Sequence, residues 1–356
     1  MPESEDPADF VAFLDETIPG LMEELDVPGV AVALVEEGAV YAARGYGVAN
    51  RATGTPVEPD TGFRVGSVSK PLTAWGVMRL HEEGKLRLDA PAEQYITRWH
   101  LPLSEFDREG VTIRRLLTHT AGLSLEYIAP FGPDEELPTL EAALSGATRG
   151  HGDVRVVAEP GSAFRYSGGG YMLLQLVIEE VTGRSFEEYM QKEVLEPLGM
   201  VSSTFKWTPE PGPSIAVGND DSDRQVPNYR YTGTAAAGLY STAGDLARFV
   251  ATLAGRPPGG GVLRPETVKL MTEPAAETEE EGIARGVFFL DRRSGLTVVG
   301  HAGSDVGWNA KLLVLPERRQ GIVVLTNSDG GARLHGEVGC SWIAWATRKS
   351  VGTVCP

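Results

Sequence analysis

Short apolar runs typical of β-strands occur near both ends of the chain, and this arrangement constrains the fold more than any other feature. Residues 30–35 and 40–46 are joined by the turn-like stretch EEGA and predict a hairpin. Four further runs lie late in the chain, at 286–290, 296–299, 311–315 and 322–326. Antiparallel strands from the two ends can share one sheet, so we expect a single sheet assembled from both ends.

Helical spacing of apolar residues dominates the middle of the chain, between residues 71 and 198. The segments with this spacing are 72–88, 114–118 and 171–181, and two more are expected at 9–25, interrupted by Pro19-Gly20, and at 338–347. The sequence therefore predicts an α/β (α+β) fold, an antiparallel sheet flanked by helices with an inserted all-helical domain. We place the discontinuous α/β sandwich domain at 1–75 and 210–356 and the helical domain at 76–209.

The balance of charges limits the possible partners. Lys and Arg total 32 against 49 Asp and Glu, a net charge of −17, which argues against binding a phosphate backbone or an anionic membrane surface. No CxxC or HExxH motif occurs and the six histidines are scattered, so no metal and no cofactor are expected. A small-molecule substrate remains the expected partner.

The compartment is predicted from the chain start and from the two cysteines. The first residues, MPESEDPADF, lack the basic and apolar regions of a signal peptide, and no apolar run reaches the ~20 residues of a membrane span. Cys340 and Cys355 are too few for a disulfide framework, and we expect them to be buried thiols. A cytoplasmic location is the resulting expectation.

A lysine stands three residues after a serine at the head of an apolar run, in the stretch FRVGSVSK. Residues i and i+3 share one face of a helix, so Ser67 and Lys70 would be neighbours. A lysine desolvated in a pocket loses part of its proton affinity and can take the proton of a serine hydroxyl. Pro71 suits the first turn of the helix, where its missing N–H costs nothing. By itself the four-residue pattern also arises by chance.

Two further stretches could complete such a site. Tyr166 lies in FRYSGGG, ahead of the helical segment 171–181, and a nearby lysine ammonium would lower the pKa of its phenol. VGHAGS ends a strand-like run and places His301 between glycines. Read alone, Tyr166 could equally be a core residue and His301 a loop residue. His119, in LLTHTAGL, is expected to make a structural hydrogen bond, and Asp305 is expected to be an exposed loop carboxylate.

The stretches GSVSK, YSG and HAG, in this order, resemble the three active-site motifs of the serine β-lactamase and penicillin-binding-protein superfamily, the SxxK enzymes. The class C β-lactamase-related serine hydrolases, or CubicO family, look most similar. LLTHTAGL, EPGSAFRYSGGGYMLLQLVIEEVTGRSFEEYM, EPLGM, AAAGLYSTAGDLARF and GHAGSDVGW extend the likeness over nearly the whole chain. The resemblance implies a β-lactamase/transpeptidase-like fold.

The resemblance also implies roles for individual residues. Ser67 matches the acylated nucleophile, Lys70 its proton partner, and Tyr166 the tyrosine that relays a proton to the leaving group. The triplet that begins at His301 and ends at Gly303 takes the place of a Lys-Thr-Gly strand motif. The family's oxyanion hole uses two backbone N–H groups, which here would be those of Ser67 and Ser304.

Two positions depart from the family's pattern. The β-lactamases have Tyr-x-Asn as second motif, and the Asn side chain binds the substrate amide, whereas this chain has Gly168 there. His301 replaces a lysine, and an unperturbed imidazole is mostly neutral at pH 7, so it attracts a substrate carboxylate less strongly. Both changes disfavour efficient β-lactamase activity and favour esters or unusual amides.

Three functions stay open at the level of the sequence. The first is a serine hydrolase that cleaves an ester, amide or lactam through an acyl-enzyme and is esterase-like. The second is an ATP-independent acyltransferase that passes the same acyl group to an amine or alcohol. The third, a non-catalytic ligand-binding or sensor protein, would not require all of Ser67, Lys70 and Tyr166.

Overall fold

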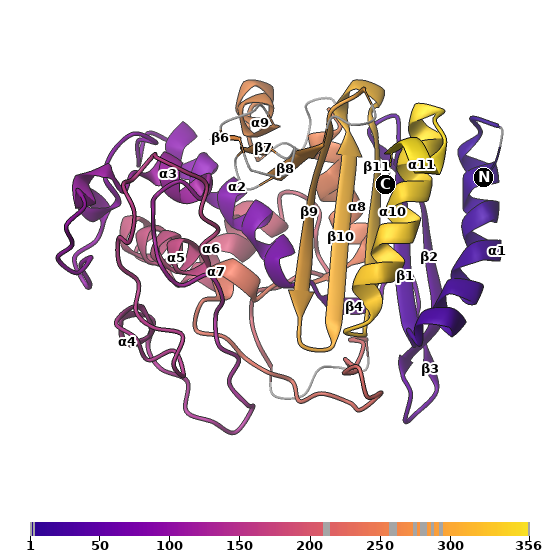
Figure 1. The fold of residues 1–356 in the computed structure, drawn as a ribbon, viewed down its shortest axis with the longest axis horizontal. Coiled ribbons are helices and arrows are strands. Elements are labelled where there is room, and N and C mark those ends of the chain that lie inside the picture. Colours follow the sequence, from indigo (N-terminus) through magenta and orange to yellow (C-terminus); the bar gives the residue numbers. More distant parts are fainter. Residues whose placement is uncertain are drawn as a thin grey trace.

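A nine-stranded antiparallel sheet forms one half of the molecule (Figure 1). The computed structural model describes residue 2 and residues 4–208, 214–255, 262–272, 276–277, 283–285, 288–291 and 295–354. The strand order is β3-β2-β1-β11-β10-β9-β8-β7-β6. The strands are β1 (Gly29–Glu36), β2 (Ala39–Asn50), β3 (Thr55–Pro56), β6 (Ala276–Glu277), β7 (Ile283–Arg285), β8 (Phe288–Asp291), β9 (Val298–Asp305), β10 (Trp308–Leu315) and β11 (Gln320–Thr326). Because β1 pairs with β11, the sheet joins both ends of the chain, which confirms the predicted fold class.

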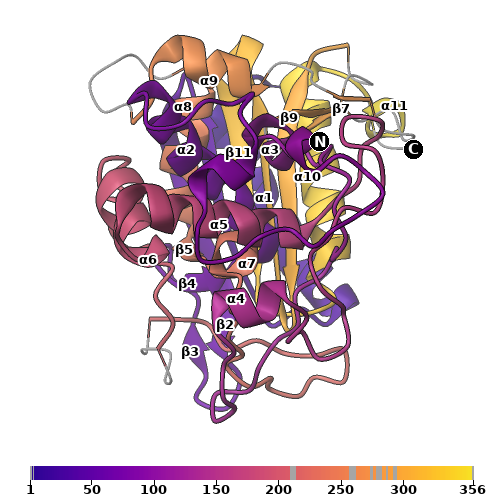
Figure 2. The same cartoon turned by 90° about the vertical axis from the view of Figure 1, so that its left-hand side faces the viewer.

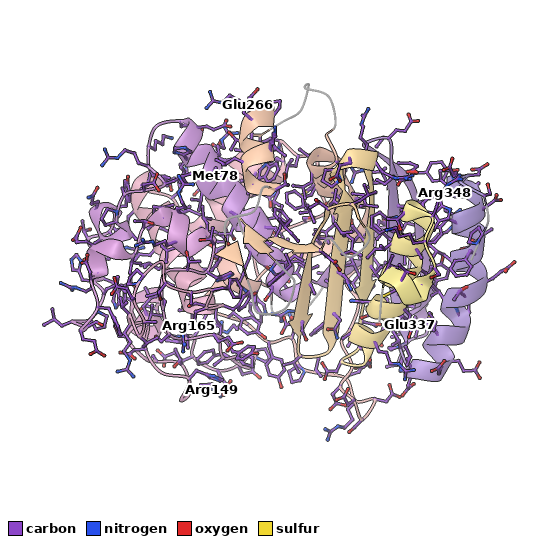
Figure 3. The ribbon with its side chains drawn as sticks, turned by 45° about the horizontal axis from the view of Figure 1, so that its top comes forward. Met78, Arg149, Arg165, Glu266, Glu337 and Arg348 are labelled. Carbon is purple, nitrogen blue, oxygen red and sulfur yellow. The ribbon has the colours of Figure 1, made fainter. Side chains whose placement is uncertain are left out.

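Helices cover both faces of this sheet. On one face lie α1 (Pro7–Leu25), α10 (Gly331–Thr347) and α11 (Val351–Val354), and on the other lies α8 (Ala243–Leu253). All residues of β1 except the last are buried, because helices cover both faces of the sheet at this strand. Successive side chains point to opposite faces: Val30, Val32 and Leu34 pack towards α1 and α10, whereas the intervening residues join the core on the other face. Figure 3 shows the charged side chains of Glu337 and Arg348 on the outside of this layer.

The second half of the molecule is helical and faces the viewer in Figure 2. Its central helix, α5, packs against α2, α3, α4, α6 and α7. The helices are α2 (Ser69–Glu82), α3 (Ile113–Leu117), α4 (Leu140–Leu144), α5 (Gly168–Thr182), α6 (Phe186–Met190) and α7 (Thr234–Ala237), with a π-helical turn at Gln191–Leu195 and α9 (Pro265–Thr272) nearer the sheet. Short 3-10 turns are η1 (Gly66–Val68), η2 (Ala92–Tyr95), η3 (Arg108–Gly110) and η5 (Pro316–Arg318). The division at 76–209 stays a prediction.

A separate two-stranded sheet lies near the junction of the two halves. It consists of β4 (Gly62–Arg64) and β5 (Tyr240–Thr242), and β4 leads directly into η1 and α2. In Figure 1, α2 runs between the helical half and the large sheet, and its side chain Met78, labelled in Figure 3, is buried. The chain around Ser67 is therefore held at the boundary between the sheet and the helices.

Several expected element boundaries differ from the observed ones. α1 continues through Pro19, because that residue lies on the exposed side, where water can satisfy the carbonyl that loses its partner. α5 begins at Gly168 rather than at Tyr171, because the Ser167 hydroxyl caps it by accepting a hydrogen bond from the Gly170 N–H at 3.0 Å. Part of the strand expected at 286–290 lies outside the described residues.

Two findings bear on the expected compartment. Cys340, expected to be a free thiol, is disulfide-bonded, and Cys355 lies outside the described residues. In the part of the chain that the structure describes, no helix is both long and apolar enough to cross a bilayer.

Candidate active site

Ser67 and Lys70 lie next to each other at the start of α2. Ser67 is in η1, and Lys70 is the second residue of the α-helix that follows it directly. The Lys70 Nζ donates hydrogen bonds to the Ser67 Oγ and to the Ala236 carbonyl oxygen, both at 2.9 Å. The i, i+3 spacing in the sequence is therefore sufficient to bring the amine to the hydroxyl. Pro71 occupies the first turn of α2, as expected.

Lys70 is buried and its proton affinity is reduced. The residue is 2% exposed, and burial lowers its pKa from 10.5 to about 7. An amine with this pKa is neutral in about half of the molecules at pH 7, and only the neutral form can accept a proton. The Lys70 side chain thus meets the requirement for a base beside a serine hydroxyl.

Tyr166 contacts both Lys70 and Ser67. The Lys70 Nζ is 4.8 Å from the centroid of the Tyr166 ring, and the phenol forms a hydrogen bond with the Ser67 side chain. Burial nevertheless raises the pKa of Tyr166 above its usual range, although the hydrogen bond with Ser67 acts in the opposite direction. The prediction that this pKa would be lowered is wrong, because burial disfavours the charged phenolate. Tyr166 is therefore a neutral phenol, able to donate its proton.

His119 packs against the Tyr166 ring. Its ring centroid lies 4.3 Å from that of Tyr166, and its Nδ1 accepts a hydrogen bond from the Ser167 N–H at 3.1 Å. Burial holds the pKa of His119 well below its usual value, so the ring is neutral. The expected structural hydrogen bond is confirmed, and it fixes the residue that follows Tyr166.

Two glycines, Gly303 in β9 and Gly66 in η1, allow the strand to pass close to the turn that carries Ser67. A Cβ on Gly303 would lie 2.0 Å from the Val65 carbonyl oxygen and 2.9 Å from the Ser67 backbone nitrogen. A Cβ on Gly66, whose φ is +48°, would lie 2.9 Å from the backbone nitrogen of Ser304. Only glycine permits this approach, which brings the backbone of Ser304 against the turn that carries Ser67.

His301 lies three residues earlier on the same strand. The stretch VGHAGS was expected at the end of a strand, but β9 continues through it to Asp305. The His301 ring is buried, and its Nδ1 lies 2.5 Å from the Ala302 carbonyl oxygen, to which it can only donate. Burial, followed by the charge of Lys70, lowers the pKa of His301 to about 3. The imidazole is therefore neutral near pH 7.

Comparison with known proteins identifies the family. The family described as Beta-lactamase matches residues 14–338, most of the chain. The chain belongs to the Beta-lactamase family. Its members include serine hydrolases that act on small amides and lactams.

Individual relatives are distant. "Protein flp" of Staphylococcus aureus (strain N315) is 24% identical over 318 residues, which are 88% of this chain and 62% of that protein. The octameric penicillin-binding protein homologue from Pyrococcus abyssi is 30% identical with a TM-score of 0.81, over 97% of this chain and 79% of that one. A class C beta-lactamase, 23% identical over 94% of both chains with a TM-score of 0.75, shares the fold.

Gly168 departs from the Beta-lactamase pattern in more than the lack of a side chain. Its N–H donates to the Glu126 carbonyl oxygen at 3.0 Å. A Cβ at Gly168 would lie 2.8 Å from that oxygen and 3.1 Å from the Cγ1 of Ile128. The space that an asparagine would need in a Tyr-x-Asn motif is thus occupied by the segment 126–128.

Two residues near the site were missed or misplaced by the sequence analysis. Asp305, expected to be exposed, is buried and forms an ion pair with Arg64, a residue that was not predicted to lie near the site. An arginine between the apolar Phe63 and Val65, just before the serine motif, was the available signal, because a buried arginine requires a partner. Within the described residues no cluster of three or more His, Cys, Asp or Glu side chains could hold a metal ion.

Proposed function

We propose that this protein is a serine hydrolase that forms an acyl-enzyme on Ser67 from an ester or amide and is esterase-like rather than an efficient β-lactamase. The observation that carries the proposal is the contact between the Lys70 Nζ and the Ser67 Oγ at 2.9 Å, made by an amine whose pKa is about 7. A non-catalytic binding protein would have no need of a buried, half-neutral lysine against a serine hydroxyl.

The first half of the reaction attaches the acyl group to the serine. Neutral Lys70 takes the Ser67 proton as the Oγ attacks the substrate carbonyl, which forms a C–O bond and moves an electron pair onto the carbonyl oxygen. The backbone N–H groups of Ser67 and Ser304 would hold this oxyanion. Tyr166 then gives its phenolic proton to the leaving group and regains one from the Lys70 ammonium, so the amine is neutral again when the leaving group departs.

The second half releases the acid. A water molecule attacks the acyl carbon, and its proton is relayed through the Tyr166 hydroxyl, which passes its own proton to the neutral Lys70 amine. The collapse of the second tetrahedral intermediate breaks the bond to the Ser67 Oγ, which recovers its proton from Lys70. Because both halves pass through an oxyanion, the same two backbone N–H groups serve acylation and deacylation.

Two features support esters or unusual amides over penicillin-like substrates. Gly168 offers no amide side chain, and its surroundings leave no space for one. His301 is neutral at pH 7, since its pKa is about 3, so it supplies no positive charge for a substrate carboxylate. Substrates that depend on neither contact suit this site best.

Hydrolysis of p-nitrophenyl acetate tests the proposal. Ser67→Ala is expected to abolish turnover and the mass increment left by a fluorophosphonate, whereas Ser222→Ala, which alters an exposed serine, should leave both unchanged. Full activity of Ser67→Ala would overturn the mechanism. Added amines or alcohols separate hydrolysis from acyl transfer, because transfer yields a new amide or ester in place of the free acid.

A further inference from the structure

A buried ion pair links the chain segment just before one proposed oxyanion donor to the strand that carries the other. The Arg64 Nε lies 2.7 Å from the Asp305 Oδ2, and the two side chains are 2% and 1% exposed. Arg64 ends β4, three residues before Ser67, and Asp305 ends β9, directly after Ser304. The pair therefore joins a residue three positions before one proposed donor to the residue directly after the other.

Aromatic rings enclose the Arg64 guanidinium. Its carbon lies 5.1 Å, 5.3 Å and 5.5 Å from the ring centroids of Tyr231, Tyr240 and Trp308, distances at which cation–π attraction operates. The Tyr231 phenol also donates a hydrogen bond to the Asp305 Oδ1. These rings leave the guanidinium little freedom to move.

Backbone groups complete the surroundings of the ion pair. The Asp305 Oδ1 accepts a hydrogen bond from the Val306 N–H at 2.8 Å, and the Arg64 Nη1 donates one to the Tyr229 carbonyl oxygen. Each end of the pair is thus held by at least one group besides its charged partner. The contacts of the pair therefore come from several directions.

The ion pair connects two strands, β4 and β9, that are not hydrogen-bonded to each other in a sheet. β4 belongs to the two-stranded sheet with β5, whereas β9 belongs to the nine-stranded sheet, so among the described residues no ladder connects the two strands. A buried ion pair adds little net stability, because the cost of desolvating both charges offsets their attraction. Its contacts, by contrast, can fix one strand relative to another.

We propose that the Arg64–Asp305 pair, with the Tyr231 phenol, is a positioning device that sets the distance between the backbone N–H groups of Ser67 and Ser304. This inference rests on the proposed function, since it concerns the oxyanion of the same acyl transfer. Oxyanion donors must meet one atom at hydrogen-bonding distance, so a shift of either strand weakens the transition state more than the bound substrate. Arg64 also neutralises a carboxylate that would otherwise repel the oxyanion.

Three variants test this role with p-nitrophenyl acetate as substrate and phenylboronic acid as a probe whose adduct with Ser67 is a tetrahedral anion. Tyr231→Phe removes only the phenol contact, and we expect kcat to fall about 3- to 10-fold with KM unchanged. Arg64→Met leaves Asp305 charged and unpaired and should lower kcat at least 100-fold. The double variant Arg64→Met/Asp305→Asn removes that charge and should regain part of the loss, yet stay about 10- to 100-fold below the wild type, since losing one oxyanion donor outright costs about 10²–10³-fold. The boronate Ki should rise in proportion to the fall in kcat.

Tyr46→Phe is the matched control. The Tyr46 phenol donates to an Asp15 carboxylate oxygen at 2.8 Å on the α1 side of the sheet, so this variant also removes a Tyr–Asp hydrogen bond and should keep wild-type kcat and Ki. Wild-type kcat and Ki in both Tyr231→Phe and the double variant would overturn the inference. If Arg64→Met and the double variant do not fold, the kcat and Ki of Tyr231→Phe alone test the inference, and wild-type values would overturn it. A wild-type protein without Ser67-dependent hydrolysis would instead overturn the proposed function.

Discussion

Replacing Lys70 by methionine should alter the stability of the protein in a pH-dependent way. The unfolded chain keeps the lysine proton up to its usual pKa of 10.5, whereas the folded protein releases it near pH 7. Between these values the unfolded state binds more protons, so the free energy of unfolding of the wild type rises with pH. Below pH 7 both states are protonated, and the full cost of burying the charge persists. Methionine does not titrate, so the variant lacks this pH-dependent contribution to the free energy of unfolding.

The magnitude follows from the change in pKa. A change of 10.5 to about 7 corresponds to roughly 5 kcal/mol in total, at ~1.4 kcal/mol per unit. Between pH 7 and pH 9 the contribution is about 2–3 kcal/mol, because one proton is released per molecule over nearly all of that range. The variant also loses the two hydrogen bonds of Lys70, worth ~1 kcal/mol each, but that loss is the same at each pH.

Urea unfolding at pH 7, 8 and 9 measures this effect. The free energy of unfolding of Lys70→Met relative to wild type should be most favourable at pH 7 and decline by about 2–3 kcal/mol by pH 9. Lys206→Met removes an exposed lysine and controls for the loss of a positive charge. A difference between Lys70→Met and wild type that stays constant within about 0.5 kcal/mol would refute the reasoning.

Three further predictions concern activity and the second motif. The kcat/KM for p-nitrophenyl acetate should fall about tenfold per pH unit below pH 7, because Lys70 is a base only when neutral; a flat profile from pH 5 to 8 would exclude this role. Tyr166→Phe should keep the ring contact with His119 but lower kcat about 10²–10⁴-fold, whereas undiminished turnover would remove the phenol from the mechanism. Gly168→Asn should destabilise the protein by about 1–3 kcal/mol, since its Cβ meets the Glu126 carbonyl oxygen at 2.8 Å, and should not hydrolyse nitrocefin. Thermal unfolding and nitrocefin turnover check that last prediction, which a stable, nitrocefin-hydrolysing variant would contradict.

Much of the fold could be predicted because it depends on local patterns. Short apolar runs bounded by turn residues predicted β1, β10 and β11, and their positions at opposite ends of the chain predicted one shared sheet. The start of α5 was misjudged because three glycines favour a loop, whereas the Ser167 cap and the contacts with the segment 124–128 stabilise a helix there. Capping and packing of this kind are not visible in residue spacing.

The sequence by itself determined that a lysine amine stands beside a serine hydroxyl, because three positions separate them where η1 continues directly into α2 and residues at this spacing share one face. The tertiary structure decided the proton affinities of that site. It buries Lys70, which lowers one pKa to about 7, and it buries Tyr166, which raises another against the expectation from charge alone. It also brought Asp305 to Arg64 from 241 positions away in the chain (305 − 64). Desolvation and long-range pairing depend on what surrounds a residue in space, and only the complete fold supplies those surroundings.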